Sequence, residues 1–153
     1  MEDKNKSVEG RVIFLSNGRR ASPLLWKSRK IPQVCDSTKT AETRAADKLI
    51  DDSVFLARMI REIYTGEKSQ KQLPVILYSD SEPLLESIHS TKQVERKMVR
   101  HIIQSMKDNL SRGEIEEFKW IESKRMLADV LTKDTNLSDL SDVVKTGDIT
   151  YYL

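Results

Sequence analysis

Three acidic residues, Glu42, Asp80 and Asp129, occupy places in the sequence where an isolated charge would be costly. Asp80 directly follows an apolar run, Asp129 stands between apolar neighbours, and Glu42 lies at the start of an apolar helical stripe. A charge in such surroundings needs a partner or a bound cation. Carboxylate oxygens suit Mg²⁺ or Mn²⁺, and several of them can hold two ions about 3.5–4 Å apart for phosphodiester hydrolysis. The three residues therefore predict a site for divalent cations.

Two of these acidic residues also have a purely structural interpretation. Asp80 would cap a following helix whose first turn holds Ser81, Glu82 and Pro83. Glu42, as an acidic residue in the first turn of its own helix, would complement the helix dipole. The sequence leaves both interpretations open beside the metal site.

The acidic residues are positioned by a predicted alternation of helices and strands. The run Leu73–Asp80 favours a strand and is too short for a helix, and its continuous apolar character predicts burial on both faces. A long helix over Ala41–Tyr64, ended by Gly66, precedes this strand. Its predicted apolar stripe is formed by Ala45, Ala46, Leu49, Ser53, Leu56, Ile60 and Ile63. In α/β folds function gathers beyond the C-terminal ends of strands, which is where Asp80 stands.

The remaining segments complete the predicted α/β fold. Asn17-Gly18 is a strong hairpin signal between strands over Arg11–Ser16 and Leu24–Ser28, and Arg29–Ser37 is predicted as a loop. The later elements are helices over Glu82–His89 and Thr91–Ser111, a strand over Glu114–Glu122, a short amphipathic helix over Ser123–Lys133 and a short helix within Asp134–Lys145. Gly147–Leu153 receives no clear assignment.

Length and composition limit the class of protein. With 153 residues, of which 38% are hydrophobic and 33% charged, the chain has the size and polarity of one globular domain. It contains no apolar run of about 18 residues, so no membrane partner is expected. The single cysteine, Cys35, excludes an internal disulfide and a cysteine-based zinc site, and it favours a reducing compartment.

Basic residues form two clusters, although the net charge is only +2. The residues expected to contact nucleic acid are Lys27, Arg29 and Lys30 in the first cluster and Arg96, Lys97 and Arg100 in the second, which also holds Lys92 and Lys107. The alternative for both clusters is an ordinary solvated face. Trp26, next to the first cluster, either stacks on a base or fills core, and core is the favoured role.

Four segments carry a resemblance to a known family. They are Leu24-Leu25-Trp26-Lys27-Ser28-Arg29-Lys30, Thr40-Ala41-Glu42-Thr43, Tyr78-Ser79-Asp80-Ser81 and Leu127-Ala128-Asp129-Val130-Leu131-Thr132-Lys133. In type, order and approximate spacing they resemble the ribonuclease H domain of copia-type retrotransposon, retrovirus-related Pol polyproteins. The last segment is the most specific, because Leu-Ala-Asp-x-Leu-Thr-Lys is close to a signature of that family. The resemblance covers about Gly10 to Lys133.

The resemblance implies a ribonuclease H-like fold, in which helices flank a mixed five-stranded sheet that starts with an antiparallel hairpin. It implies hydrolysis of the RNA strand of RNA–DNA hybrids with two Mg²⁺ (or Mn²⁺) ions. Glu42 and Asp80 would hold metal, and Asp129 would complete the site near the attacking water. The implied partners are RNA–DNA hybrid or other nucleic acid and the reverse transcriptase part of the same polyprotein. The implied location is intracellular, in the cytoplasm, in virus-like particles or in the nucleus.

The chain departs from the family's pattern at its start. The family's first aspartate lies on a central strand that precedes the strand predicted at Arg11–Ser16, and Met1–Gly10 does not resemble that strand. We therefore expect a flexible lead over residues 1–10, a ribonuclease H-like domain over 11–133 that lacks this strand, and a tail over 134–153. The alternative to an enzyme is a non-catalytic remnant of the domain that binds nucleic acid or protein.

Overall fold

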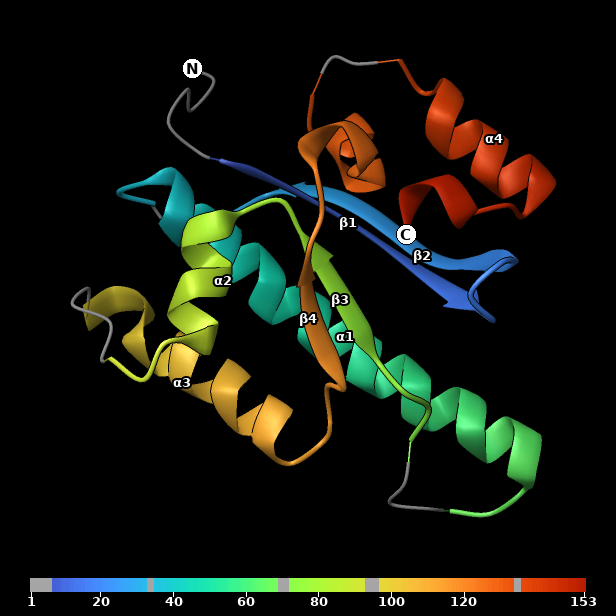
Figure 1. The fold of residues 1–153 in the computed structure, drawn as a ribbon, viewed down its shortest axis with the longest axis horizontal. Coiled ribbons are helices and arrows are strands. Elements are labelled where there is room, and N and C mark those ends of the chain that lie inside the picture. The colour runs from blue at the N-terminus through green and yellow to red at the C-terminus, as the bar shows by residue number, and fades with distance from the viewer. Residues whose placement is uncertain (1–6, 33–34, 69–71, 93–96, 134–135) are drawn as a thin grey trace. The chain divides into compact units, whose positions relative to one another are not determined.

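The computed structural model describes residues 7–32, 35–68, 72–92, 97–133 and 136–153, and the chain divides into two compact units. Unit 1 comprises Met1–Asp36 and Ile121–Leu153, and unit 2 comprises Ser37–Trp120. Unit 1 contains β1 (Val8–Ser16), β2 (Ala21–Lys30), the 3₁₀ helices η1 (Ser123–Arg125) and η2 (Leu127–Leu131), α4 (Ser138–Thr146) and the 3₁₀ helix η3 (Thr150–Tyr152). Unit 2 contains α1 (Thr38–Thr65), β3 (Ile76–Ser79), α2 (Glu82–His89), α3 (Lys97–Ser111) and β4 (Glu117–Trp120) (Figure 1). The predicted α/β class is confirmed.

The predicted hairpin at the start of unit 1 is present, and its strands are longer than expected. The side chain of Asn17 closes the turn, because its Oδ1 accepts hydrogen bonds from the backbone N–H groups of Arg19 and Arg20 at 3.1 and 2.9 Å. Gly18 supplies the left-handed backbone, with a φ of 89°. β1 begins at Val8 rather than Arg11, and β2 continues to Lys30, so part of the expected lead and loop is strand.

A β-bulge explains how β2 accommodates a proline. The register shifts between Ile13, which pairs with Leu25, and Phe14, which pairs with Pro23, so Leu24 is the extra residue. Proline has no backbone N–H to donate to the hydrogen-bond ladder of a sheet, and a bulge is a place where a strand tolerates it.

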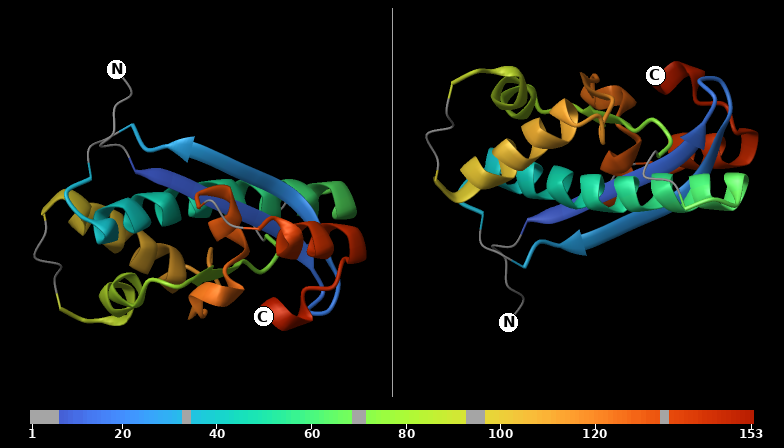
Figure 2. Two further views of the ribbon diagram at one scale, coloured as in Figure 1. Left: turned by 90° about the horizontal axis from the view of Figure 1, so that it is seen from above. Right: turned by 90° about the horizontal axis from the view of Figure 1, so that it is seen from below.

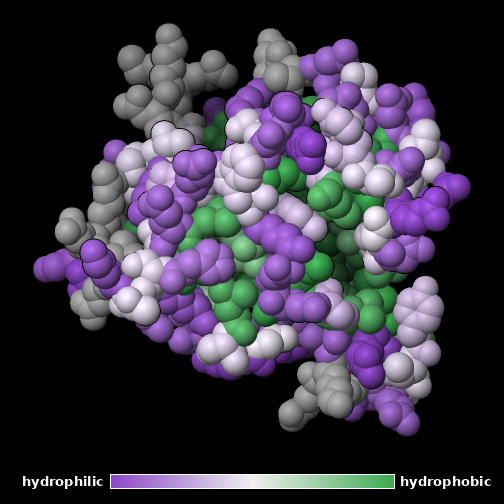
Figure 3. Space-filling model, viewed as in Figure 1, coloured by the Kyte–Doolittle hydropathy of each residue, from purple (hydrophilic) through white to green (hydrophobic). Residues whose placement is uncertain are grey.

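The core role favoured for Trp26 is wrong, because its side chain is 61% exposed. Figure 3 shows apolar residues, in green, between the hydrophilic ones that cover most of the face in view.

The C-terminal part of unit 1 is more fragmented than predicted. The expected amphipathic helix over Ser123–Lys133 is replaced by η1 and η2, whose backbone bonds join residues three apart, as from Thr132 N–H to the Asp129 carbonyl at 3.0 Å. Such short segments commonly adopt 3₁₀ geometry. The predicted late helix is confirmed as α4. Its buried Val143 clusters with Ala21, Leu127 and Ile149.

Gly10 of β1 lies where any side chain would collide with the segment that carries Asp129. A Cβ at Gly10 would lie 2.7 Å from the Ala128 carbonyl oxygen and 2.7 Å from Thr132 Cγ2. We expect Gly10→Ala to lower the free energy of unfolding by about 1–3 kcal/mol, because η2 must shift away from β1. Urea denaturation measures this, with Ser22→Ala at an exposed strand position as control. Equal stabilities of the two variants would contradict the close approach.

In unit 2 the long helix α1 is confirmed, while its buried face differs from the predicted one. Ser37 caps its start by accepting a hydrogen bond from Thr40 N–H at 3.2 Å, and Gly66 ends it with a φ of 67°. The buried positions are Thr40, Thr43, Ala46, Ile50, Ser53, Val54, Ala57 and Ile60. Ile63 of the predicted stripe is 73% exposed. Apolar residues occupy two adjacent faces of the helix. The face that contains Ile50 and Val54 is the buried one, because these two side chains pack into the core.

The strand predicted over Leu73–Asp80 is shorter and less buried than the sequence predicts. β3 pairs with β4 in parallel, from Ile76 opposite Glu117 to Ser79 opposite Trp120. Leu77 is 3% exposed whereas Ile76 is 41% exposed, so the expected burial on both faces is wrong. The buried residues Leu77 of β3 and Phe118 of β4 lie in the core together with residues of the helices. Their neighbours along each strand point to the opposite face of the strand pair, because side chains alternate in direction along a strand. The described strands form two separate pairs, antiparallel β1–β2 and parallel β3–β4, rather than one mixed sheet.

Helices α2 and α3 complete unit 2. α2 has the predicted bounds, but α3 is described from Lys97, and the predicted start at Thr91 is wrong because Thr91 and Lys92 are not helical. Residues 93–96 lie outside the described residues. Buried α3 residues include Val99, Ile102, Ile103 and Met106. α3 packs beside α1, as Figure 2 shows, and α2 contacts both helices.

Candidate functional site

The structure brings two of the three predicted carboxylates to one end of unit 2. Glu42 lies in the second turn of α1, and Asp80 directly follows β3. The hydroxyl of Ser81 donates a hydrogen bond to Glu42 Oε2. Glu42 and Asp80 are both half-buried, while Ser81 is buried. The Ser81 contact therefore holds the helix carboxylate against the residue that follows Asp80, at the C-terminal end of β3.

The start of α2 bears on the structural interpretation of Asp80. The N-cap position of α2 falls on Ser81, not on Asp80. The side chain of Ser81 does not cap α2, because its hydroxyl donates its hydrogen bond to Glu42 instead. The backbone N–H of Ser81 donates to Ser79 Oγ at 3.2 Å. An unused cap typically costs a helix about 1 kcal/mol, so this arrangement favours the contact with Glu42 over local helix stability.

The structural interpretation of Glu42 is weakened in a similar way. The first turn of α1 contains no acidic residue, and Glu42 comes after it. The influence of the helix dipole falls off within the first turn. Sequence reasoning missed Ser81 as the partner of Glu42, because the contact joins residues 39 apart and leaves no local signal.

Asp129 lies in η2 of unit 1. Its Oδ2 forms an ion pair with Lys133 Nζ at 2.6 Å, so the charge between apolar neighbours is compensated by the lysine that ends the same motif. Its backbone carbonyl also accepts hydrogen bonds from Thr132 and Lys133, which fixes the turn that carries the carboxylate. Within the described ranges, no group of three or more His, Cys, Asp or Glu residues is placed to hold a metal ion.

The first basic cluster is divided between the two faces of the hairpin. Lys27 and Arg29 alternate with Trp26 and Lys30 along β2, and side chains alternate in direction along a strand. Arg29 Nε is paired with the buried Glu9 at 3.1 Å. The three residues of this cluster that are expected to contact nucleic acid are exposed. Lys30 lies with Trp26 on one face of the hairpin, and Lys27 lies with Arg29 on the other.

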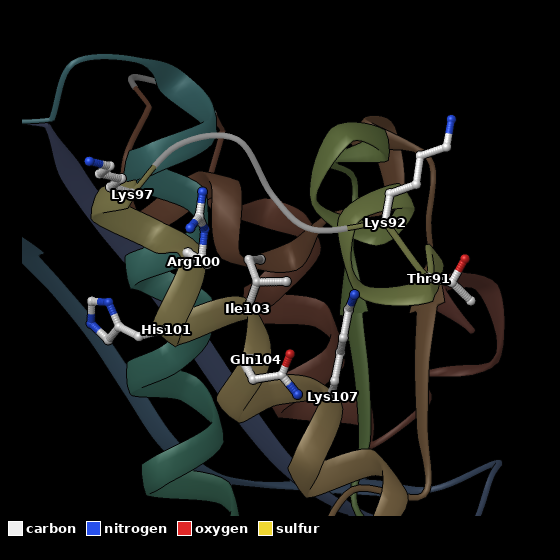
Figure 4. Close-up of a pocket in the computed structure, with 8 residues that line it drawn as sticks. All are labelled: Thr91, Lys92, Lys97, Arg100, His101, Ile103, Gln104 and Lys107. Carbon is white, nitrogen blue, oxygen red and sulfur yellow. The ribbon is translucent and has the colours of Figure 1, made fainter.

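The second basic cluster gathers around a pocket in unit 2. Arg96 lies outside the described residues, whereas Lys97 and Arg100 are exposed on the first described turn of α3. The pocket has a volume of about 410 Å³ and is lined by Thr91, Lys92, Lys97, Arg100, His101, Ile103, Gln104 and Lys107 (Figure 4). The cationic side chains come from α3 and from the segment that follows α2, and together they form an anion-attracting surface.

Two broader observations complete the description of the candidate site. Of the helices in the described ranges, none is both long enough and apolar enough to cross a membrane. No protein-family model, curated protein or solved structure matches this chain.

Proposed function

We propose that the chain is a ribonuclease H-like domain of a retrotransposon polyprotein that hydrolyses the RNA strand of RNA–DNA hybrids with divalent metal ions. The observation that carries the proposal is the hydrogen bond from Ser81 to Glu42. It joins two segments of the family resemblance, those around Glu42 and Asp80, although they are far apart in the chain. Two carboxylates at adjoining ends of a helix and a strand are the start of a hard-oxygen metal site.

The arrangement of strands supports the same proposal. The chain contains an antiparallel hairpin, then a long helix, then a parallel pair, in the order that the resemblance implies. The family's sheet has one more strand, which lies between the hairpin and β3 and carries the first aspartate. Removing that strand from the family's sheet leaves one antiparallel pair and one parallel pair, which are the two pairs described here.

The residues present fit a divalent cation in the chemistry of their donor atoms. Glu42 and Asp80 of unit 2 would hold the metal, while the role of Asp129, which lies in unit 1, stays a prediction. When bound, divalent cations lower the pKa of a coordinated water and stabilise the leaving oxygen of a phosphodiester. Ser81 fixes the direction of the Glu42 carboxylate through one oxygen, so that the other is presented in a constant orientation. Lys133 holds Asp129 in the same manner.

Cleavage of a labelled RNA–DNA hybrid tests the proposal. The folded chain is incubated with hybrid in Mg²⁺, in Mn²⁺ and in EDTA, and the RNA strand is resolved on a denaturing gel. We expect internal cuts in the RNA strand with either metal and none in EDTA. Intact RNA in both metals, with the protein shown to be folded by circular dichroism, would overturn hydrolysis by this chain.

A second candidate function is nucleic-acid binding without cleavage. The observation that favours it is that Lys92, Lys97, Arg100 and Lys107 line one pocket, whereas no complete metal-ligand group of three occurs among the described residues. Tight, salt-sensitive binding of the hybrid by a folded protein that leaves the RNA intact would select this function over hydrolysis.

A further inference from the structure

We propose that the pocket lined by α3 and the segment after α2 holds consecutive phosphates along one strand of a bound nucleic acid. This inference rests on the proposed function for the identity of the ligand as a nucleic acid, but it does not require cleavage. The residues proposed to contact the phosphates are Lys92, Lys97, Arg100 and Lys107. The site is built entirely from unit 2.

The lining of the pocket has the composition of an anion site. Among the described residues that line it, four are cations and none is Asp or Glu. The buried Ile103 contributes apolar surface, while Lys92, Lys97 and Arg100 are exposed. Cations of one sign gathered around a concave surface repel one another and raise the local concentration of anions. An anion that bridges them relieves this repulsion.

The spacing on α3 favours an extended ligand over a single small anion. Lys97, Arg100, Gln104 and Lys107 recur every three or four residues, so they share one face of the helix. At 1.5 Å of rise per residue the stripe is about 15 Å long. One nucleic-acid strand carries a charge about every 3.4 Å along the axis of a B-form duplex, so a stripe of this length spans several phosphates.

Lys107 is positioned for this role by its own contact. Its Nζ donates a hydrogen bond to the Ser90 carbonyl at 2.5 Å, at the C-terminal cap of α2. An ammonium group has three donors, so this bond fixes the group and leaves donors for a ligand. Figure 4 shows Lys92, Arg100 and Lys107 extending in roughly the same direction.

Two polar lining residues are engaged elsewhere. Gln104 donates to Asp108 Oδ1 at 3.0 Å, within α3. The imidazole of His101 points away from Lys92 and Lys107 (Figure 4). Burial and the nearby Asp51 raise the pKa of the Asp47 carboxyl on α1, while Lys48, His101 and Arg44 lower it. We therefore assign phosphate contact to the three lysines and Arg100, and not to His101.

The salt dependence of binding tests this assignment without any cleavage. Affinity of the chain for a labelled RNA–DNA hybrid is measured in EDTA over a series of KCl concentrations, for the wild type and for Lys92→Ala and Lys97→Ala. Each lysine that contacts a phosphate adds about 1 to the slope of log affinity against log salt, so each variant should lose about 1. Lys48→Ala is the control, because Lys48 is exposed on α1 and pairs with Asp51 outside the pocket.

The outcomes separate this inference from the proposed function. Slopes in Lys92→Ala and Lys97→Ala equal to that of Lys48→Ala would overturn the pocket as a phosphate site, while metal-dependent cleavage could still stand. Inorganic phosphate is titrated by calorimetry as a second probe. Saturable phosphate binding that Lys97→Ala abolishes, with an unchanged slope for the hybrid, would identify a small-anion site instead and would also overturn the proposal.

Discussion

We expect Asp80→Asn to reduce the proposed metal-dependent cleavage of an RNA–DNA hybrid by at least about 100-fold and to leave the fold intact. Asparagine keeps the shape of the side chain and removes the charge that a divalent cation needs. Metal ions supply several kcal/mol of transition-state stabilisation, and each 1.36 kcal/mol is a factor of about ten in rate. Stability should change little, because Asp80 is half-buried after the end of β3 and the N-cap position of α2 falls on Ser81.

The matched control is Glu82→Gln, which removes one negative charge two residues away, at an exposed position in the first turn of α2. Initial cleavage rates in Mg²⁺ are compared for wild type, Asp80→Asn and Glu82→Gln, with thermal denaturation beside them. Full activity in a folded Asp80→Asn would refute its role as a metal ligand. Equal losses in both variants would indicate a general electrostatic effect rather than coordination.

The parts of the fold that were predictable are those with short-range signals. Asn17 and Gly18 specify the turn of the hairpin through their own side chain and backbone. Gly66 ends α1, and Pro83 lies in the first turn of α2, where the conformational preferences of these residues act locally. Such features are readable because the residues that cause the structure are adjacent in sequence.

The parts that were not predictable depend on contacts between distant segments. The buried face of α1 is decided by packing of Ile50 and Val54 against other elements, because apolar residues lie on two adjacent faces. Ile76 is exposed although its run is continuously apolar, because it points to the opposite side from Leu77, whose side chain lies in the core of unit 2. A periodic or apolar pattern describes one segment, while burial is a property of the assembled core.

In the candidate site, too, local sequence signals were predictable and contacts between distant segments were not. Glu42 and Asp80 were recognisable because a carboxylate on an apolar stripe or after an apolar strand is out of place. The role of Ser81 was not recognisable, since serine before Glu82 and Pro83 is also an ordinary helix start. Arg96 lies outside the described residues, so its predicted contact with nucleic acid stays a prediction.

Leu84→Ala should destabilise the protein by about 2–5 kcal/mol, the range for removing a fully buried leucine side chain. Leu84 is 0% exposed and belongs to the core that α1, α2, α3 and both strands of unit 2 share. Whole domains are stable by only about 5–15 kcal/mol, so this loss is a large fraction of the total. Leu84 follows Ser81 by one helical turn, and loosening α2 should therefore also weaken the hold of Ser81 on Glu42.

Leu85→Ala is the matched control, because it makes the same chemical change at the next residue, which is only partly buried. Urea denaturation should give a clearly smaller loss for Leu85→Ala than for Leu84→Ala, since less apolar surface and less cavity are involved. Mn²⁺ affinity measured by calorimetry below the unfolding transition should fall for Leu84→Ala and stay near wild type for Leu85→Ala. Equal unfolding losses would mean that α2 does not pack through Leu84. Unequal losses with unchanged Mn²⁺ affinity would separate the packing of α2 from the orientation of Glu42.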